Sequence, residues 1–406
     1  MKRIIFSAAL MAALGLSSCS DQFLEDKQNF DNVTSEVYND YAGASGRVLD
    51  LYWWILPDPN SDANWKYPCT GKADGISKST EEYSGFGLFV NPQAELSVLG
   101  SNKVPDYFHN QSNNIRESVW GRIRNCNDVI AGISGSSLTE EQKNELLGQA
   151  YFLRAWWHFE LLKMYGGKAK NGKALGIPLA DHFISQDEAA QNGEFLRPTY
   201  QATVDFIVND LNNAIELLPN VYQGDDLEFG NTQIGRATKA AAAVLKSRAL
   251  LYSASPAMQD DDVTKITGMG QFEILNPTVY QAKWEAVAKE INKILGMEGF
   301  GTYVPVTASS IADVQTESSD YAFRRYFNNN LLEGYHFPPF YYGSARATPS
   351  HNLVKAFYAK NGYPATDVRS GVDLSDPDFD LTQLYAVLDN RFALNVYYHS
   401  ATFGDS

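Results

Sequence analysis

Two long stretches of this chain combine aromatic rings with hydrogen-bonding side chains, residues 57–112 and residues 298–350. A flat ring stacks on the apolar C–H face of a sugar, while amide, carboxylate and cationic groups bond its hydroxyls. These side chains therefore suit a carbohydrate, although the same rings could instead fill small cores within their own loops. The candidate stacking rings are Trp65, Tyr67, Tyr83, Tyr335, Tyr341 and Tyr342, and the candidate polar contacts are Asn64, Lys72, Asp74 and Arg346.

No arrangement typical of a catalytic or cofactor site occurs along the sequence. It contains no HExxH, no G-x-S-x-G, no Walker loop and no G-x-G-x-x-G. The six histidines lack ligand spacing, and His158, one helical turn after Arg154, is interpreted as a structural polar residue. We therefore expect a protein that is not an enzyme and that has no cofactor and no metal site. Carboxylates are plentiful, so a glycosidase pair stays open as an alternative.

Two acidic segments are weaker candidates for cation sites. Residues 376–380 contain three aspartates and are interpreted as a solvated turn. Residues 58–62 alternate oxygen-bearing side chains, but Ala63 follows where a calcium loop of the EF-hand type needs glycine. We expect neither segment to hold calcium.

The first residues have the pattern of a lipoprotein signal peptide. Lys2 and Arg3 precede an apolar run that is too short to span a bilayer, and the run ends in small residues directly before Cys19. We expect cleavage after residue 18, lipidation of Cys19, a polar tether over residues 19–30 and a folded body over residues 31–406. The pattern predicts a secreted lipoprotein that is held to a membrane by the lipid on Cys19.

Charge and cysteine content restrict the possible partners. The formal net charge is −15, and loss of Lys2 and Arg3 with the signal peptide makes it −17. An acidic chain without a basic cluster is not expected to bind nucleic acid. With Cys19 lipidated, Cys69 and Cys126 remain; Cys126 lies on an apolar helical stripe, which favours a buried free thiol.

Apolar residues recur at spacings of three and four, which predicts helices that each bury one face. Capping signals support several of them: Thr139 with Gln142 at one start, and Thr199 and Thr238 at two others. The third helix should bury Phe152, Trp156 and Phe159, and Trp157 is also expected in the core. The other stripes are Tyr38, Tyr41, Ala42, Leu49, Tyr52 and Ile55; Ile115, Val119, Ile123, Cys126, Ile130 and Ile133; Val204, Ile207, Leu211 and Ile215; Ala241, Leu245, Ala249 and Tyr252; and Trp284, Val287, Ala288, Ile291 and Leu295.

Bulky and small residues alternate on these stripes, which is typical of helical hairpins that stack as an array. The residues predict a mostly α fold and suggest a tetratricopeptide-like array of helical hairpins, although the period of the pattern is irregular. The two aromatic stretches interrupt this pattern, and loops of that length in a compact body usually carry function.

Several segments in order resemble one family of surface lipoproteins. The lipidated Cys19 and the residues after it resemble the mature N-terminus of the SusD/RagB family of Bacteroidetes. Further matching segments are Trp120, Ile123 and Asn127; Gly148 to Trp156, with Tyr165-Gly166-Gly167; Gly176 to Leu179, which resembles a strand; Arg197-Pro198-Thr199; Asp210-Leu211; Gly235 to Ala241; and Phe357 with Asn361-Gly362-Tyr363-Pro364.

The resemblance implies a function and a partner. Members of this family bind oligosaccharides or polysaccharides without catalysis, on a scaffold of helix pairs whose long loops recognise the ligand. They deliver the ligand to a SusC-like, TonB-dependent outer-membrane transporter, which they cover as a lid. A peptide-binding lid, a surface glycoside hydrolase and an adaptor that binds no ligand are the alternatives.

Two features depart from the family pattern. The family usually has a run such as Asn-Arg-Asp-Pro-Arg near the position of Asp389-Asn390-Arg391, but here Phe392-Ala393-Leu394 follows, so we expect a different local turn. The sequence also ends at Ser406, soon after this point, whereas the resemblance implies a further large segment. We therefore expect a chain that is truncated at its C-terminus.

Overall fold

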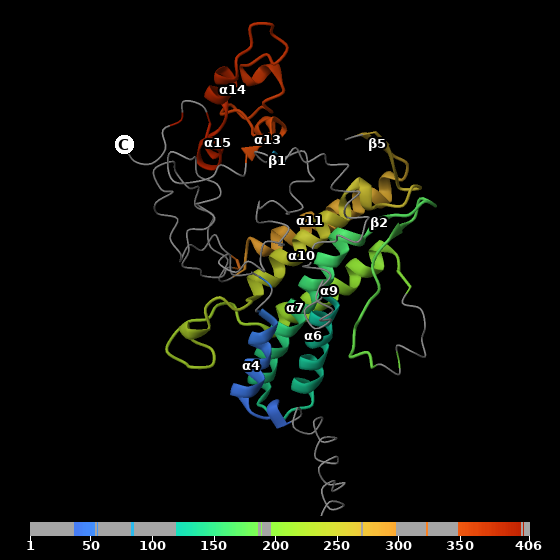
Figure 1. Ribbon diagram of the computed structural model, residues 1–406, viewed down its shortest axis with the longest axis vertical. Coiled ribbons are helices and arrows are strands. Elements are labelled where there is room, and N and C mark those ends of the chain that lie inside the picture. Colours follow the sequence, from blue (N-terminus) through green and yellow to red (C-terminus); the bar gives the residue numbers. More distant parts are fainter. Residues whose placement is uncertain are drawn as a thin grey trace, which may run out of the picture.

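The computed structural model of the chain describes residues 36–52, 55, 83–84, 119–185, 188, 196–268, 271–297, 322–323, 348–398 and 401. Over these ranges the protein is mostly helical, as the sequence predicts (Figure 1). The main body contains α4 (Tyr41–Tyr52), α6 (Val119–Ser134), α7 (Glu140–Tyr165), α9 (Tyr200–Leu217), α10 (Lys239–Ala254) and α11 (Pro277–Ile294). Three shorter helices follow: α13 (His351–Ala356), α14 (Leu381–Val387) and α15 (Asn390–Asn395).

Consecutive helices of the main body pack side by side as a helical array. Helix α6 packs on α7, α7 on α9, α9 on α10 and α10 on α11, while α4 lies against α6 and α7 (Figure 1). The short connection between α6 and α7 makes these two helices a hairpin. This arrangement matches the predicted array of helical hairpins.

The predicted capping residues mark the observed helix starts. Thr139 accepts a hydrogen bond from the backbone N–H of Gln142, and the Gln142 side chain accepts from the backbone N–H of Thr139, which completes a capping box. Thr199 and Thr238 cap α9 and α10 through their hydroxyl oxygens. Each cap satisfies a backbone N–H group that has no partner within its helix.

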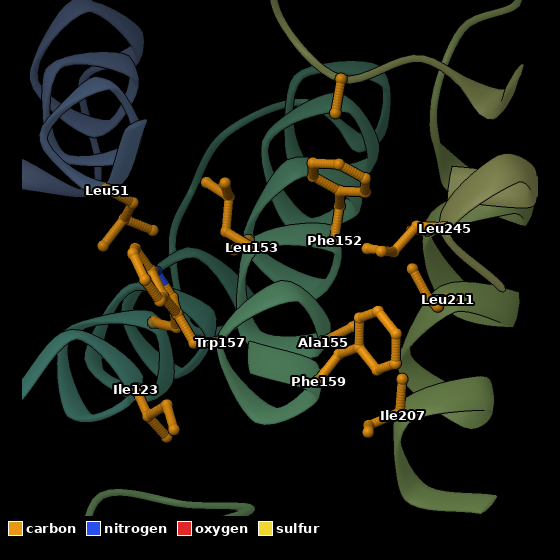
Figure 2. Packing of buried hydrophobic residues seen from close by; sticks show 14 of the residues in the cluster. Leu51, Ile123, Phe152, Leu153, Ala155, Trp157, Phe159, Ile207, Leu211 and Leu245 are labelled. Carbon is orange, nitrogen blue, oxygen red and sulfur yellow. The ribbon is translucent and has the colours of Figure 1, made fainter. Parts of the chain in front are cut away.

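Helix α7 is surrounded by other helices, so its buried residues are not confined to one stripe. Phe152 and Phe159 are buried as predicted, and Figure 2 shows them on the side of the helix that faces α9 and α10. Trp157 is fully buried towards Leu51. Trp156 was predicted to be buried, but its ring is only partly buried where it packs against the core.

Two other apolar stripes differ from their predictions. In α4 the buried side chains include Ala44, Val48 and Leu51, whereas Leu49 is 49% exposed. The predicted stripe is therefore confirmed in part: Tyr38 and Ile55 are buried, and Tyr41 and Tyr52 pack partly buried against the core, but Ala42 and Leu49 are exposed. In α11, Val287 is buried against the array but Trp284 remains 40% exposed, so only part of the expected stripe reaches the core.

Gly148 allows close contact between α7 and the end of α9. A Cβ atom at this position would lie 2.8 Å from Cγ of Leu218 and 3.1 Å from its backbone nitrogen. A larger residue would therefore push the two elements apart, which explains why glycine begins the Gly148–Trp156 segment.

The strands are short antiparallel pairs rather than a continuous sheet. Strands β2 (Gly167–Lys168) and β3 (Ala174–Leu175) form one pair, and β4 (Thr264–Gly268) and β5 (Gln271–Ile274) form another. The strand expected over 176–179 is absent from these ladders, because β3 ends at Leu175. After β3, the Gly176 N–H donates a hydrogen bond to the carbonyl of Pro198, and the Ile177 N–H donates to the Thr203 hydroxyl.

The C-terminal helices have a small core of their own. Its buried residues include Val354, Ala365, Leu384 and Phe392. Helix α15 begins after Asp389, whose side chain caps it, and Phe392 places its ring in this core. The departure from the family pattern at Phe392 therefore produces a short helix that is anchored by a buried ring.

Candidate functional site

The two aromatic stretches meet at a short strand pair. Strand β1 (Tyr83–Ser84) belongs to the first stretch, and β6 (Thr348–Pro349) belongs to the second. They pair antiparallel, with Tyr83 opposite Pro349 and Ser84 opposite Thr348. Helix α13 starts directly after β6, and its N-cap Ser350 fixes that end of the second stretch. Segments more than two hundred residues apart in the sequence are thus joined at one place.

The second stretch also contacts the helical core through Phe323. Its ring centroid lies 5.2 Å from that of Phe152, 5.9 Å from that of Trp156 and 6.2 Å from that of Tyr52. The first two rings belong to α7 and the third belongs to α4. Sequence reasoning missed Phe323, because it is one of several aromatic residues in this stretch, and the sequence shows no periodicity that would single it out.

Among the candidate ligand contacts, Tyr83 falls within the described residues, and its backbone lies in β1. The other candidates lie outside the described residues, as does the lipidation residue Cys19, and all remain predictions. These candidates are Trp65, Tyr67, Tyr335, Tyr341, Tyr342, Asn64, Lys72, Asp74 and Arg346.

Arg154 lies at the centre of a buried polar network that supports this scaffold. Its Nε and Nη2 donate to the carboxylate of Asp210 at 2.7 and 2.6 Å. Its Nη1 donates to Oδ1 of Asn127 at 2.9 Å and to the carbonyl of Asp181 at 2.7 Å. Asn127 in turn donates to the carbonyl of His182 at 2.7 Å. One guanidinium therefore joins α6, α7, α9 and the segment that follows β3.

His158 has the structural role that the sequence predicts. The ring is fully buried, its Nδ1 lies 2.9 Å from the carbonyl of Arg154, and its Nε2 accepts from the backbone N–H of Ala180 at 3.4 Å. Burial lowers the pKa of His158 to about 4, so the ring is neutral at physiological pH. The neutral form with the proton on Nδ1 satisfies both bonds.

Arg197 and the Asn361 turn stabilise backbone in the same way. Arg197 donates to the carbonyls of Gly176 and Tyr165, both at 2.7 Å. Asn361 donates to the carbonyl of Arg369 at 2.9 Å, and the next residue, Gly362, adopts a φ of 85° that favours glycine. These recognisable motifs therefore position chain segments, rather than presenting side chains to a ligand.

Cys126 is a buried free thiol, as the sequence predicts, and burial raises its pKa to about 12. The acidic segment 376–380 is an exposed turn in which Asp380 caps α14. Among the residues that the structure describes, no group of three or more His, Cys, Asp or Glu side chains is arranged to hold a metal ion. No helix in the described ranges is long and apolar enough to span a bilayer.

Comparison with known proteins shows a partial sequence match and a shared fold. Residues 77–251 match a SusD-like sequence family, which is described as starch-binding and associating with the outer membrane. A SusD-like carbohydrate binding protein from Bacteroides fragilis shares the fold with a TM-score of 0.59 at 20% identity, over 90% of this chain and 61% of that one. A second SusD-like protein from Bacteroides fragilis gives a TM-score of 0.56 at 21% identity, over 88% and 60%.

The chain is therefore similar to the SusD-like family in sequence over residues 77–251, and its fold is similar to that of SusD-like proteins. The chain spans about 60% of the length of each of these two Bacteroides fragilis proteins. A search of the curated proteins gave no significant match.

Proposed function

We propose that this protein binds oligosaccharides or polysaccharides at the cell surface without catalysis. The observation that carries the proposal is the family match over residues 77–251, because that family is described as starch-binding. The ligand face would consist of the two aromatic stretches, which the β1–β6 pair joins at Tyr83 and Pro349. In this reading the helical array supplies the rigid support, and the loops supply stacking rings and hydroxyl contacts.

We also propose an outer-membrane location and a transport role. Cys19 would carry the lipid anchor, and the folded body would lie over a SusC-like, TonB-dependent transporter and deliver ligand to it. The signal sequence and the family description, which names association with the outer membrane, support this assignment. Affinity purification of the lipidated protein from envelopes should recover a barrel of this type.

The test of glycan binding is a glycan array on the mature domain, followed by calorimetry with the best ligand. Trp65→Ala should lower the affinity by about tenfold or more, since loss of one stacking ring removes roughly 1–3 kcal/mol in the analogous stacking on nucleic-acid bases. Trp284→Ala is the matched control, because this exposed tryptophan lies on α11, outside both aromatic stretches.

The same reagents separate the alternatives. A peptide-binding lid would give an empty glycan array but retain members of a peptide library. A glycoside hydrolase would release products that chromatography detects after incubation with the glycan. Equal loss of affinity in Trp65→Ala and Trp284→Ala would remove Trp65 from the ligand site.

A further inference from the structure

A buried polar cluster lies where α4, α7 and the segment between α9 and α10 meet. Glu145 and Gln149 lie one turn apart on α7, and the Gln149 side-chain amide donates to Oε1 of Glu145. Tyr222 donates its hydroxyl to the same oxygen at 2.9 Å. Arg236 donates from Nη2 to Oγ of Ser45, on α4, at 2.9 Å. All five residues are more than nine-tenths buried.

Three side-chain atoms of this cluster have no hydrogen-bond partner in the part of the chain that the structure describes. They are Oε2 of Glu145, Oε1 of Gln149 and Nη1 of Arg236. Nη1 lies 3.7 Å from Oε1 of Glu145, which is an ion-pair distance but too long for a hydrogen bond. An unpaired polar group in a protein interior has lost its hydrogen bonds to water without replacement, so buried polar atoms nearly always have partners.

The chemistry of the three atoms specifies what would satisfy them together. Two are acceptors, on Glu145 and Gln149, and one is a donor, on Arg236. A water molecule offers two donors and accepts up to two hydrogen bonds, and internal waters typically make about three. A metal cation does not fit this set, because the guanidinium of Arg236 would repel it, and an anion would be repelled by Glu145.

We propose that this cluster is an internal water-binding site, in which one water donates to Glu145 and Gln149 and accepts from Arg236. The water would connect α7 to the segment that carries Arg236, and through Ser45 to α4. Direct bonds already follow the same route: the carbonyl of Glu228 accepts from Tyr41 at 3.1 Å. The water would therefore complete the hydrogen-bond network that holds α4 and the segment between α9 and α10 against α7.

The charged and titratable groups around Glu145 are Arg236, Tyr222, Glu228, Tyr41 and Tyr52. Burial raises the pKa of Glu145 to about 7, so the carboxylate predominates only at higher pH. Protonation of Glu145 would turn one carboxylate oxygen into a donor, and that oxygen would then no longer need a hydrogen bond donated by the water. The test is therefore made in crystals at about pH 8.5, well above this pKa.

The first experiment is a crystal structure of the mature protein at that pH, at a resolution that orders internal waters. We expect one density peak within about 2.7–3.2 Å of all three atoms. Direct bonding among the three atoms, or a peak that contacts fewer than two of them, would overturn the proposal.

A second measurement tests the site in solution. Magnetic relaxation of solvent nuclei counts long-lived internal waters. Gln149→Met keeps the length of the side chain but removes its amide oxygen, which would accept from the water, together with the amide nitrogen that donates to Glu145, and it should lower the count by one. Gln201→Met is the matched control, because Gln201 is exposed on α9 and its replacement should leave the count unchanged. An unchanged count in a folded Gln149→Met protein would refute the site; if this variant does not fold, the crystal experiment decides.

Discussion

The adjacent tryptophans Trp156 and Trp157 on α7 allow a direct test of which core residue stabilises the helical array and which one supports the second aromatic stretch. Trp157 is fully buried, and the guanidinium of Arg122 lies 4.5 Å from its ring centroid. A buried tryptophan removes about 150–250 Å² from water, which at roughly 25 cal/mol per Å² corresponds to about 4–6 kcal/mol. Trp157→Ala should therefore lower the free energy of unfolding by about 3–5 kcal/mol, the usual range for such truncations.

Trp156→Ala should be much milder for global stability. This ring is only partly buried, and its Nε1–H is buried without a partner among the described residues. Truncation removes an unsatisfied donor along with the ring, which offsets part of the lost burial. We expect a net loss of about 1 kcal/mol, given the 1–3 kcal/mol cost of an unpaired buried group.

The two variants should also differ in where the protein opens. Trp156 contacts Phe323, which belongs to the second aromatic stretch, so its loss should increase hydrogen exchange at Phe323 and weaken glycan binding. Urea unfolding of both variants measures the change in the free energy of global unfolding. Hydrogen-exchange mass spectrometry measures the change in local opening near Phe323. If Trp156→Ala destabilises the protein as much as Trp157→Ala, the reasoning from burial is wrong.

Three further predictions follow from the scaffold and the anchor. Asp210→Ala should destabilise the protein by about 3–5 kcal/mol in urea unfolding, because it leaves the buried guanidinium of Arg154 without its counter-charge; a loss below 1 kcal/mol would contradict a central role for this pair. The folded protein holds the Glu145 proton more tightly than the unfolded chain, with a pKa of about 7 against 4.5, so this group stabilises the protein at low pH, and that stability is lost as pH rises through 7. The neutral His158 changes the pH dependence of stability in the opposite sense. The quantity to measure is therefore the difference in unfolding free energy between wild type and Glu145→Gln, which should change by up to about 3 kcal/mol between pH 4.5 and 8. Stability profiles that run parallel over this pH range would refute the assignment. Cys19→Ala should abolish lipid labelling and release the protein from the membrane fraction, and continued labelling of this variant would disprove the anchor.

The helical scaffold could be predicted because its signals are local. Thr139, Thr199 and Thr238 act within one turn of themselves, so the sequence alone placed three helix starts correctly. The face that a helix buries is a tertiary property. Helix α4 carries apolar side chains around much of its circumference, and the neighbouring helices determine that Val48, and not Leu49, is covered.

The candidate site was less accessible to sequence reasoning, for a related reason. A strand pair of two residues on each side, such as Tyr83–Ser84 with Thr348–Pro349, has no periodicity to detect, and its partners are far apart in the sequence. Phe323 acts through rings on α4 and α7, which only the folded array brings together. Composition could indicate that both stretches are rich in aromatic residues. It could not indicate that the two stretches pair through β1 and β6, because that contact forms only in the folded chain.

The residues that match the family pattern have a different role from the residues that would determine ligand specificity. Arg154, Asp210, His158 and Gly148 are buried, and each contacts neighbouring helices or backbone in a way that few substitutes allow. Such constraints hold whatever ligand is bound, so they can specify a fold without specifying a glycan. The loop residues have the opposite property, since a ring on a supported loop can be exchanged at little cost to the array. Ligand identity must therefore be read from variants of the loops, measured on a scaffold whose stability has not changed.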